Sequence, residues 1–261
     1  MQPLSGTVFL LISGASQGIG KKIAETFAPL LKPGSQILLL ARNLEGLIDT
    51  KNNLPKYLTI NTASIDLSTA SADDLTGTMT NFLKNDEISK FDQAMIVHNA
   101  GSLGNIAQKT IEMTNFTVWR QYYDLNVFSP AILNNVFMKF FGSQVKCKIF
   151  IVNITSLCAL QPMKSLAYYC SGKAAREMFF KVFAAENPDV NVLNYSPGPV
   201  KTNMLNVVCQ DVGDTEVKKK FNELKDKDTA LSPEKTVTRL LQVLVEQNYV
   251  SGDHVDFYDI L

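Results

Sequence analysis

The stretch "VFLLISGASQGIGKKIAETF", residues 8–27, joins an apolar run, a glycine-rich turn and a segment of helical period. Gly14, Gly18 and Gly20 have the spacing GxxxGxG. Glycines let the backbone turn sharply and approach a ligand, and the helix that follows directs its N–H groups and positive dipole end to the same place. A strand, turn and helix in this order predict a pyrophosphate site, and a purely structural turn is the alternative.

Short apolar runs and helical segments alternate through the rest of the chain. The later runs are "QILLLAR", "YLTINTASI", "QAMIVHNAG", "CKIFIVNIT", "VNVLNYSPG" and "HVDFY", and the later helical segments are "LEGLIDTKNNL", "ADDLTGTMTNFL", Trp119 to Phe141, one beginning near Leu166, and about Pro233 to Gln247. The runs lack clean polar alternation, as expected for parallel strands covered by helices on both faces. We therefore predict one Rossmann-like α/β domain over residues 1–261, a doubly wound parallel sheet of about seven strands.

The segment from Pro197 to Leu231 breaks this rhythm. It is polar, contains the run Lys218, Lys219, Lys220, and is too long for an ordinary connection. It is a candidate lid over a ligand, and a solvated surface helix is the alternative for the lysine run.

Composition excludes several classes of function. Lys plus Arg and Asp plus Glu both number 25, so no net basic charge favours nucleic acid or a membrane surface. The N-terminus has no basic region before its short apolar run, which argues against a signal peptide or membrane span. The expected partner is a small molecule or another protein, and the expected location is cytoplasmic.

The four cysteines, Cys147, Cys158, Cys170 and Cys209, have neither CxxC nor zinc-site spacing, and the chain has only two histidines. We predict free thiols in a reducing compartment and no metal site.

Residues after the second and later apolar runs indicate which dinucleotide is bound. Arg42 follows the second run, where a guanidinium would pair with the 2′-phosphate of NADPH and an acidic residue would favour NADH. A surface arginine is the alternative. Asp66 and the "NAG" of residues 99–101 end the third and fourth runs and would flank the adenine and its ribose, although an Asp there can also cap a helix.

"SLAYYCSGKAAR", residues 165–176, places two tyrosines before a lysine. Residues four apart share a helix face, so Tyr169 stands over Lys173 whereas Tyr168 stands over Gly172. A free phenol has a pKa of about 10, and a nearby ammonium favours the phenolate. Tyr169 is therefore predicted to be a general acid, with its pKa lowered by Lys173, that protonates a carbonyl oxygen as a hydride arrives at the carbonyl carbon.

Two more polar residues complete this predicted group. Ser156 ends "CKIFIVNITS", where its hydroxyl could polarise the same carbonyl oxygen. Asn126 lies inside the long helical segment, where its amide could hold a helix distortion and a water that leads protons to Lys173.

Together these residues resemble the short-chain dehydrogenase/reductase family, whose pattern is GxxxGxG, NAG after the fourth strand, and Ser with YxxxK. The resemblance covers essentially the whole chain. "NITSLCALQPMKSLAYYCSGKAAREM", "VLNYSPGPVKTNM" and "SGDHVDFYD" further resemble the family members that reduce pterins. This resemblance implies a homodimeric, NADPH-dependent reductase of pterin side-chain carbonyls, such as those of 6-pyruvoyl-tetrahydropterin.

The resemblance also implies roles for individual residues. The implied catalytic residues are Ser156, Tyr169, Lys173 and Asn126. The implied NADPH contacts are Gly14, Ala15, Ser16, Gln17, Gly18, Ile19, Gly20, Ala41, Arg42, Asn43, Asp66, Leu67, Asn99, Ala100, Gly101, Tyr169, Lys173, Val200, Thr202 and Met204. The implied substrate contacts are Ser156, Leu157, Tyr169, Gly198, Met204 and Asp256.

Asp256 would be the pterin anchor, because a carboxylate can accept a paired hydrogen bond from the 2-amino group and the adjacent ring N–H. A salt bridge at a dimer surface is the alternative for Asp256. Gln17 departs from the family pattern, since related reductases often have Arg there, so recognition of the 2′-phosphate depends more on Arg42.

Other functions remain open at this point. A family member that reduces another ketone or diketone fits the same catalytic group, and only Asp256 and the C-terminal match oppose it. A cofactor-sensing binding protein without turnover is a second alternative. For the homodimer, the helices around residues 117–141 and Lys173 could form a four-helix interface, although the apolar residues 179–185 are as compatible with the core.

Overall fold

The computed structural model describes residues 2–83, 85–143 and 146–260. This part of the chain contains a parallel sheet of seven strands. The strands are β1 (Val8–Ser13), β2 (Gln36–Ala41), β3 (Thr59–Ser64), β4 (Gln93–His98), β5 (Lys148–Ile154), β6 (Asn191–Ser196) and β7 (His254–Asp256). Their order in the sheet is β3-β2-β1-β4-β5-β6-β7, so the direction of winding reverses between β1 and β4. The predicted doubly wound fold is confirmed, and its switch point is where such sheets bind ligands.

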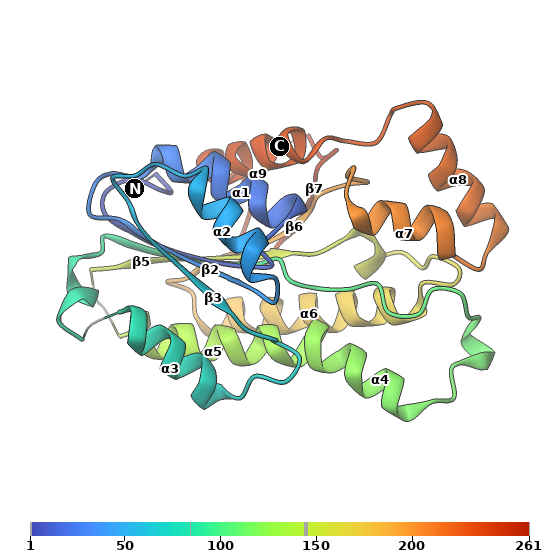
Figure 1. Ribbon diagram of the computed structural model, residues 1–261, viewed down its shortest axis with the longest axis horizontal. Coiled ribbons are helices and arrows are strands. Elements are labelled where there is room, and N and C mark those ends of the chain that lie inside the picture. The colour runs from blue at the N-terminus through green and yellow to red at the C-terminus, as the bar shows by residue number, and fades with distance from the viewer. Residues whose placement is uncertain (1, 84, 144–145, 261) are drawn as a thin grey trace.

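Helices cover both faces of the sheet. They are α1 (Gly18–Phe27), α2 (Leu44–Asn52), α3 (Ala72–Phe82), α4 (Phe116–Tyr123), α5 (Ser129–Phe141), α6 (Ala167–Glu186), α7 (Asn203–Asp211), α8 (Thr215–Asp226) and α9 (Pro233–Glu246), with short helices η1 (Ala28–Leu30), η2 (Asn85–Lys90), η3 (Thr110–Glu112), η4 (Asp124–Phe128) and η5 (Leu157–Ala159). In Figure 1, α1, α2 and α9 lie above the sheet, and α3, α5 and α6 lie below it. Across the described ranges, no helix has the length and apolar character needed to cross a membrane.

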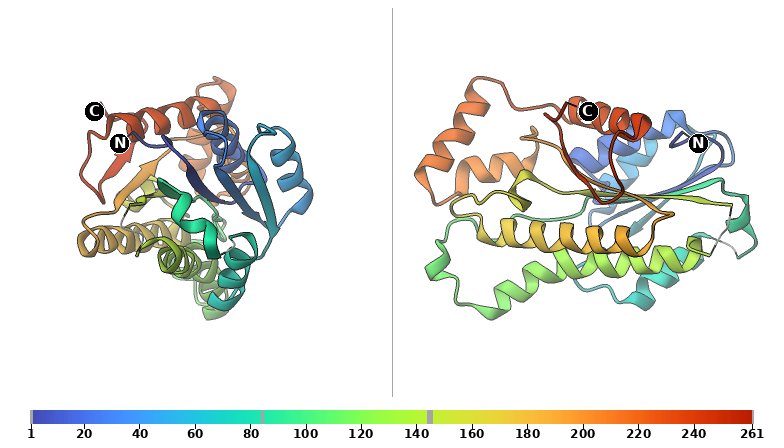
Figure 2. Two further views of the ribbon diagram at one scale, coloured as in Figure 1. Left: turned by 90° about the vertical axis from the view of Figure 1, so that its left-hand side faces the viewer. Right: turned by 180° about the vertical axis from the view of Figure 1, so that it is seen from behind.

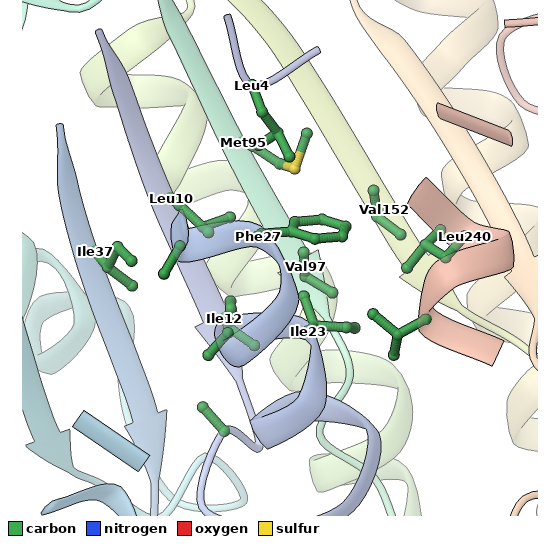
Figure 3. Packing of buried hydrophobic residues seen from close by; sticks show 14 of the residues in the cluster. Leu4, Leu10, Ile12, Ile23, Phe27, Ile37, Met95, Val97, Val152 and Leu240 are labelled. Atoms are coloured by element: carbon green, nitrogen blue, oxygen red, sulfur yellow. The ribbon is translucent and has the colours of Figure 1, made fainter. Parts of the chain in front are cut away.

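The core consists of two layers that share the sheet. Leu10 and Ile12 of β1 pack on one face with Phe27 of α1 and Leu240 of α9 (Figure 3). Phe9 of the same strand points to the other face, where its ring lies 4.9 Å from that of Phe141. All six residues of β1 are buried, which explains why the sequence shows an apolar run without alternation.

The helix predicted from Trp119 to Phe141 is interrupted. Residues Asp124–Phe128 form a π-helical turn between α4 and α5. Asn126 Nδ2 donates to the carbonyl oxygen of Tyr122 at 2.8 Å, and Asn126 Oδ1 accepts from the N–H of Ser102 at 2.8 Å. The amide therefore holds the helix distortion expected of it and ties that distortion to the loop after β4.

The polar segment between β6 and α9 folds as two helices, α7 and α8, which project beyond one end of the sheet (Figures 1 and 2). Every residue of α8 is at least partly exposed to solvent. Lys218, Lys219 and Lys220 therefore lie on a surface helix, as the alternative interpretation predicted. The same helix also covers a cavity, described below.

Candidate active site

Two adjoining cavities lie along the carboxyl ends of the strands. The larger, of about 800 Å³, surrounds the glycine turn, and the smaller, of about 270 Å³, surrounds Tyr169. We call them the glycine-turn cavity and the Tyr169 cavity. The residues that line both are Ile19, Asn99, Gly101, Thr202 and Met204. A ligand in one cavity could therefore extend to the other.

The glycine-turn cavity is built around the start of α1. Gly14 and Gly18 have positive φ angles of 69° and 57°, which the turn requires and which favour glycine. Within the described part of the chain, no side chain caps α1, whose first residue follows Gln17. A Cβ on Gly18 would meet only Thr202, at 3.5 Å. The first-turn N–H groups are thus open to an anion, which fits the pyrophosphate of a dinucleotide.

Two of the predicted cofactor contacts lie beneath this cavity instead. Ala15 is fully buried, and its carbonyl oxygen accepts a hydrogen bond from Thr50 Oγ1 at 2.9 Å. A Cβ on Gly20 would lie 2.3 Å from the carbonyl oxygen of Gly14, so this glycine lets α1 pack closely against the turn. Neither residue belongs to the described lining of either cavity, so their contact with a cofactor stays a prediction.

Basic side chains line the glycine-turn cavity beside the end of β2. Arg42 is exposed there, as predicted, and Lys21 and Lys22 of α1 also contribute. Lys21 Nζ lies 2.5 Å from Asp49, and Lys22 Nζ lies 2.5 Å from Glu25. Neither lysine was predicted from the sequence, although both follow the last glycine directly and so lie in the first turns of α1.

Asp66 and Asn99 line the cavity at the ends of β3 and β4. Asp66 Oδ1 accepts from the N–H of Ser68 at 3.0 Å and from its hydroxyl at 2.7 Å. These hydrogen bonds, together with Arg42, lower the pKa of the Asp66 carboxyl. Asn99 Nδ2 donates to the carbonyl oxygens of Ser13 and Gly14, both at 3.1 Å, and so holds the glycine turn against β4.

Ser156, Tyr169 and Lys173 meet in the Tyr169 cavity. Ser156 follows β5, whereas Tyr169 and Lys173 lie one turn apart on α6. Lys173 Nζ is 5.5 Å from the centroid of the Tyr169 ring and donates to the carbonyl oxygen of Ile154 at 2.6 Å. Ser156 Oγ accepts from the N–H of Cys158 at 3.2 Å. The predicted catalytic group is thus assembled.

Tyr168 lies in a different environment. Its ring is 1% exposed and packs against Trp119, at 4.3 Å between ring centroids, and Tyr122, at 5.6 Å. Its side chain therefore belongs to a small aromatic cluster, and only Tyr169 of the tyrosine pair lines the cavity in the described structure.

The pKa of Tyr169 shifts in the direction opposite to the sequence-based expectation. Burial raises the pKa of the phenol, Cys158 raises it further, and the hydrogen bond with Ser156 only partly offsets this. Burial, and then Arg176, lower the pKa of Lys173. Burial thus outweighs the effects that favour the phenolate, which come from Ser156 and Arg176. Tyr169 is protonated at neutral pH, which is the form that a proton donor needs.

Buried polar residues of α6 connect the catalytic helix to the sheet. Arg176 Nε donates to Asn153 Oδ1 at 2.6 Å, and its other nitrogens donate to the carbonyl oxygens of His98 and Ala100. This guanidinium holds α6 against the ends of β4 and β5. This role of Arg176 was not predictable, because nothing in the sequence motif indicates that Arg176 is buried.

Glu177, the next residue on α6, connects the helix to β5 and β7. Glu177 Oε2 accepts from Thr155 Oγ1 at 2.7 Å and lies 2.9 Å from His254 Nδ1. Burial alone would raise the pKa of Glu177, but hydrogen bonds from His254, Lys181 and Thr155 lower it to about 2. An ionised carboxylate therefore fixes α6 to the strand that contains Asp256.

Asp256 lines the Tyr169 cavity at the end of β7. Its Oδ2 accepts from Ser196 Oγ at 2.5 Å and its Oδ1 accepts from the N–H of Tyr258 at 3.0 Å. Other predicted substrate contacts in the lining are Leu157, Gly198 and Met204, with Val200 nearby in the same cavity. Lys220, Phe221 and Leu224 of α8 complete the lining, so the surface helix also closes one side of the cavity.

Comparison with known proteins places this site among reductases. A family model described as short chain dehydrogenase matches residues 9–213. Sepiapterin reductase of Xenopus laevis is 35% identical over 257 residues, 97% of each chain, and that of Bos taurus is 34% identical over 258 residues, 97% of this chain and 96% of the relative. Benzil reductase ((S)-benzoin forming) of Bacillus subtilis is 28% identical over 256 residues, 96% of this chain and 98% of the relative.

Solved structures share the fold. A short chain dehydrogenase/reductase from Saccharomyces cerevisiae superposes with a TM-score of 0.80 at 23% identity, covering 97% of each chain. A short chain dehydrogenase from Shigella flexneri, complexed with NADP, superposes with a TM-score of 0.76 at 20% identity, covering 99% of this chain and 100% of the other.

Proposed function

The chain belongs to the short chain dehydrogenase family, and from this premise we propose that it is an NADPH-dependent reductase of pterin side-chain carbonyls. The observation that carries the proposal is a single cavity lined by Ser156, Tyr169 and Lys173 together with the carboxylate of Asp256. The sepiapterin reductases at 33% to 35% identity support this substrate class. The benzil reductases at lower identity keep reduction of a diketone as the second candidate.

The residues of the glycine-turn cavity fit NADPH. The open first turn of α1 would hold the pyrophosphate, Arg42 would pair with the 2′-phosphate, and Thr202 and Met204 would lie on the nicotinamide side, where the two cavities join. NADPH supplies the hydride for the reduction when it is bound.

The chain's own residues handle the oxygen of the carbonyl. Ser156 would donate a hydrogen bond to this oxygen and polarise it, and Tyr169 would transfer its proton to the same oxygen as negative charge develops there. Both side chains line the Tyr169 cavity, so one carbonyl oxygen there could receive both hydroxyls. Lys173, 5.5 Å from the ring centroid, would then stabilise the phenolate by its positive charge.

The role of Asn126 in a proton relay remains a prediction. Its amide holds the π-helical turn and contacts Ser102, which lines the Tyr169 cavity. Among the described residues that line the two cavities, Asn126 is not present. It would therefore act by positioning neighbouring residues and through a water molecule.

Steady-state oxidation of NADPH, with sepiapterin and benzil as parallel substrates, tests the proposed function. We expect kcat/KM for sepiapterin to exceed that for benzil by at least about tenfold, because only a pterin can use Asp256. Turnover of benzil alone would support the diketone reductase, and absence of turnover with both would contradict both candidates.

The variant Arg42→Asp tests the proposed preference for NADPH over NADH. Loss of a charge-assisted hydrogen bond costs about 1.5–3 kcal/mol, so the ratio of kcat/KM for NADPH to that for NADH should fall by about 10- to 100-fold. Lys56→Asp is the charge-matched control, because Lys56 is exposed and donates only to the carbonyl oxygen of Asn52 among its described contacts. An unchanged ratio in Arg42→Asp would exclude Arg42 from 2′-phosphate recognition.

We also propose that the protein is a homodimer joined through α5 and α6. Large apolar side chains are exposed at the end of η4, on α5 and on α6: Phe128 at 49%, Ile132 at 36%, Met178 at 59% and Val182 at 49%. A second copy could cover them with the same four side chains in a two-fold arrangement. Phe180 and Phe183, by contrast, are buried in the core.

Val182→Glu tests this interface. Burying an unpaired carboxylate between the protomers should raise the dimer dissociation constant by at least about tenfold, as measured by analytical ultracentrifugation. The control is Val245→Glu, because Val245 is similarly exposed, at 42%, and its helix α9 lies on the other side of the sheet from α5 and α6 (Figure 1). If both variants remain as dimeric as the native protein, the α5–α6 interface is wrong.

A further inference from the structure

Asp256 lies on the shortest strand of the described sheet. β7 has three residues, lies at the edge of the sheet, and pairs with β6 alone among the described strands. A short edge strand makes few main-chain hydrogen bonds, so side-chain contacts must help to fix its position. The side chains that make these contacts have no place in the reduction mechanism.

A buried carboxylate on α6 contacts this strand. The side chain of Glu177 is 2% exposed, and its Oε2 faces two donors, Thr155 Oγ1 at 2.7 Å and His254 Nδ1 at 2.9 Å. Thr155 directly precedes Ser156. Successive side chains of a strand point to opposite faces, so His254 and Asp256 of β7 point to the same face. The carboxylate thus joins the neighbour of a catalytic residue to the strand that contains Asp256.

A second route of buried hydrogen bonds leads from α6 to the turn before β7. Arg176 Nε donates to Asn153 Oδ1 at 2.6 Å, and Asn153 Nδ2 donates to Asn194 Oδ1 at 2.8 Å. Asn194 Nδ2 then donates to the carbonyl oxygen of Gly252 at 2.9 Å. This route ends at the main chain of the turn, whereas Glu177 contacts a side chain within the strand. Two adjacent residues of α6 therefore fix different parts of the segment that ends with β7.

A charged side chain at this place fixes direction as well as contact. Burying an ionised carboxylate is costly unless donors surround it. An apolar side chain of similar size could pack α6 against the sheet without that cost, but it would leave the direction of the contact open. Hydrogen bonds to an ionised group are short and directional, so those of Glu177 define how α6, β5 and β7 are spaced.

We propose that Glu177 and His254 are positioning residues that hold Asp256 at a fixed distance from the catalytic hydroxyls, and that this distance selects for a pterin. A pterin would place its paired N–H donors at Asp256 and its side-chain carbonyl at Ser156 and Tyr169 at the same time. Because the pterin ring is rigid, moving the carboxylate by about 1 Å would weaken one of these contacts. A diketone such as benzil would use the hydroxyls alone. This role rests on the proposed function, since it concerns recognition of a pterin.

His254→Leu tests the contact with β7. The variant removes the donor but leaves Glu177 with Thr155 and Lys181, so KM for sepiapterin should rise by about tenfold while kcat and KM for benzil change little. His254→Asn can place an amide N–H close to the position of Nδ1 and should bring KM back to within about twofold of the native value. Steady-state kinetics with both substrates measure these effects. His254→Phe repeats the test if His254→Leu does not fold.

A double variant tests whether His254 acts through Asp256. If it does, adding His254→Leu to Asp256→Asn should raise KM for sepiapterin no further, because the group that His254 positions is already lost. Lys181→Met is the matched control. Lys181 Nζ lies 2.8 Å from Glu177 Oε1, but the lysine side chain is 36% exposed, so its loss should change KM by less than about twofold. An additive rise in the double variant, or a KM for sepiapterin in His254→Leu that is unchanged or rises equally with that for benzil, would overturn the proposal.

Hydrogen exchange tests the hold on β7 without a substrate. We expect the amides of residues 252–258 to exchange at least about fivefold faster in His254→Leu than in the native protein, since loss of the contact lets the strand open more often. Exchange at the native rate would show that the pair does not hold β7 and would overturn the proposal. A native protein that does not reduce sepiapterin would fail the proposed function instead, and hydrogen exchange would still decide the positioning role.

Discussion

Tyr169→Phe should lower kcat for carbonyl reduction by about 10²- to 10⁴-fold, the usual contribution of a positioned proton donor. The substitution removes only the hydroxyl, and the ring can keep its place beside Lys173. The glycine-turn cavity does not include Tyr169 in its described lining, so the dissociation constant for NADPH should change little. Stopped-flow measurement of hydride transfer and fluorescence titration of NADPH would separate the two effects.

Tyr168→Phe is the natural control, because it makes the same chemical change one residue earlier. Tyr168 packs between Trp119 and Tyr122 and lies outside the described cavity linings, so its variant should keep activity within a few-fold of the native value. If Tyr168→Phe were inactive and Tyr169→Phe active, the assignment of the proton donor would be reversed. If Tyr169→Phe kept near-native kcat, the donor would have to be another group.

The order of elements was predictable because the strands are buried from both sides. Runs such as residues 36–41 and 93–98 are apolar throughout in the sequence and buried throughout in the structure. The break in the long helix was only partly predictable. Asn126 in the sequence indicated a distortion of one helix. The division into two helices, α4 and α5, was not predictable, because it depends on the hydrogen bond that Asn126 makes with Tyr122 in the folded chain.

The catalytic residues were predictable by local rules, whereas their electrostatics were not. Ser156 stands at a strand end, and Tyr169 and Lys173 stand one helical turn apart, so sequence spacing alone brings them together. The raised pKa of Tyr169 comes mainly from burial, which depends on packing from distant parts of the chain. The sequence shows that Lys173 lies one helical turn from Tyr169, but it does not show how deeply Tyr169 is buried.

Contacts between secondary-structure elements were the feature that the sequence predicted least well. Gly20 matches the dinucleotide motif, yet the carbonyl of Gly14 lies where its side chain would be, so its role is close packing. Cys158 has no metal or redox spacing, yet it lines the Tyr169 cavity, where η5 packs against α6. A motif thus identifies residue types, and the fold decides which of them face a ligand.

Asp256→Asn should raise KM for sepiapterin by about 10- to 100-fold, since hydrogen bonds to a charged group contribute about 1.5–3 kcal/mol. Asn keeps the size of the side chain and one acceptor oxygen for Ser196 or Tyr258, but it cannot accept two hydrogen bonds side by side from the pterin. KM for benzil, which has no such donors, should change little. Steady-state kinetics with both substrates would measure this difference.

Asp253→Asn serves as the control, because Asp253 is exposed just before β7 and accepts from the N–H of Val250. It should leave KM for both substrates near the native values. Asp256 also holds Ser196 and Tyr258, so a purely structural role would raise KM for both substrates or lower the melting temperature of the variant. An equal rise for sepiapterin and benzil would therefore remove the anchor role. A selective rise at unchanged thermal stability would show that the carboxylate recognises the pterin, because only that substrate offers paired donors to it.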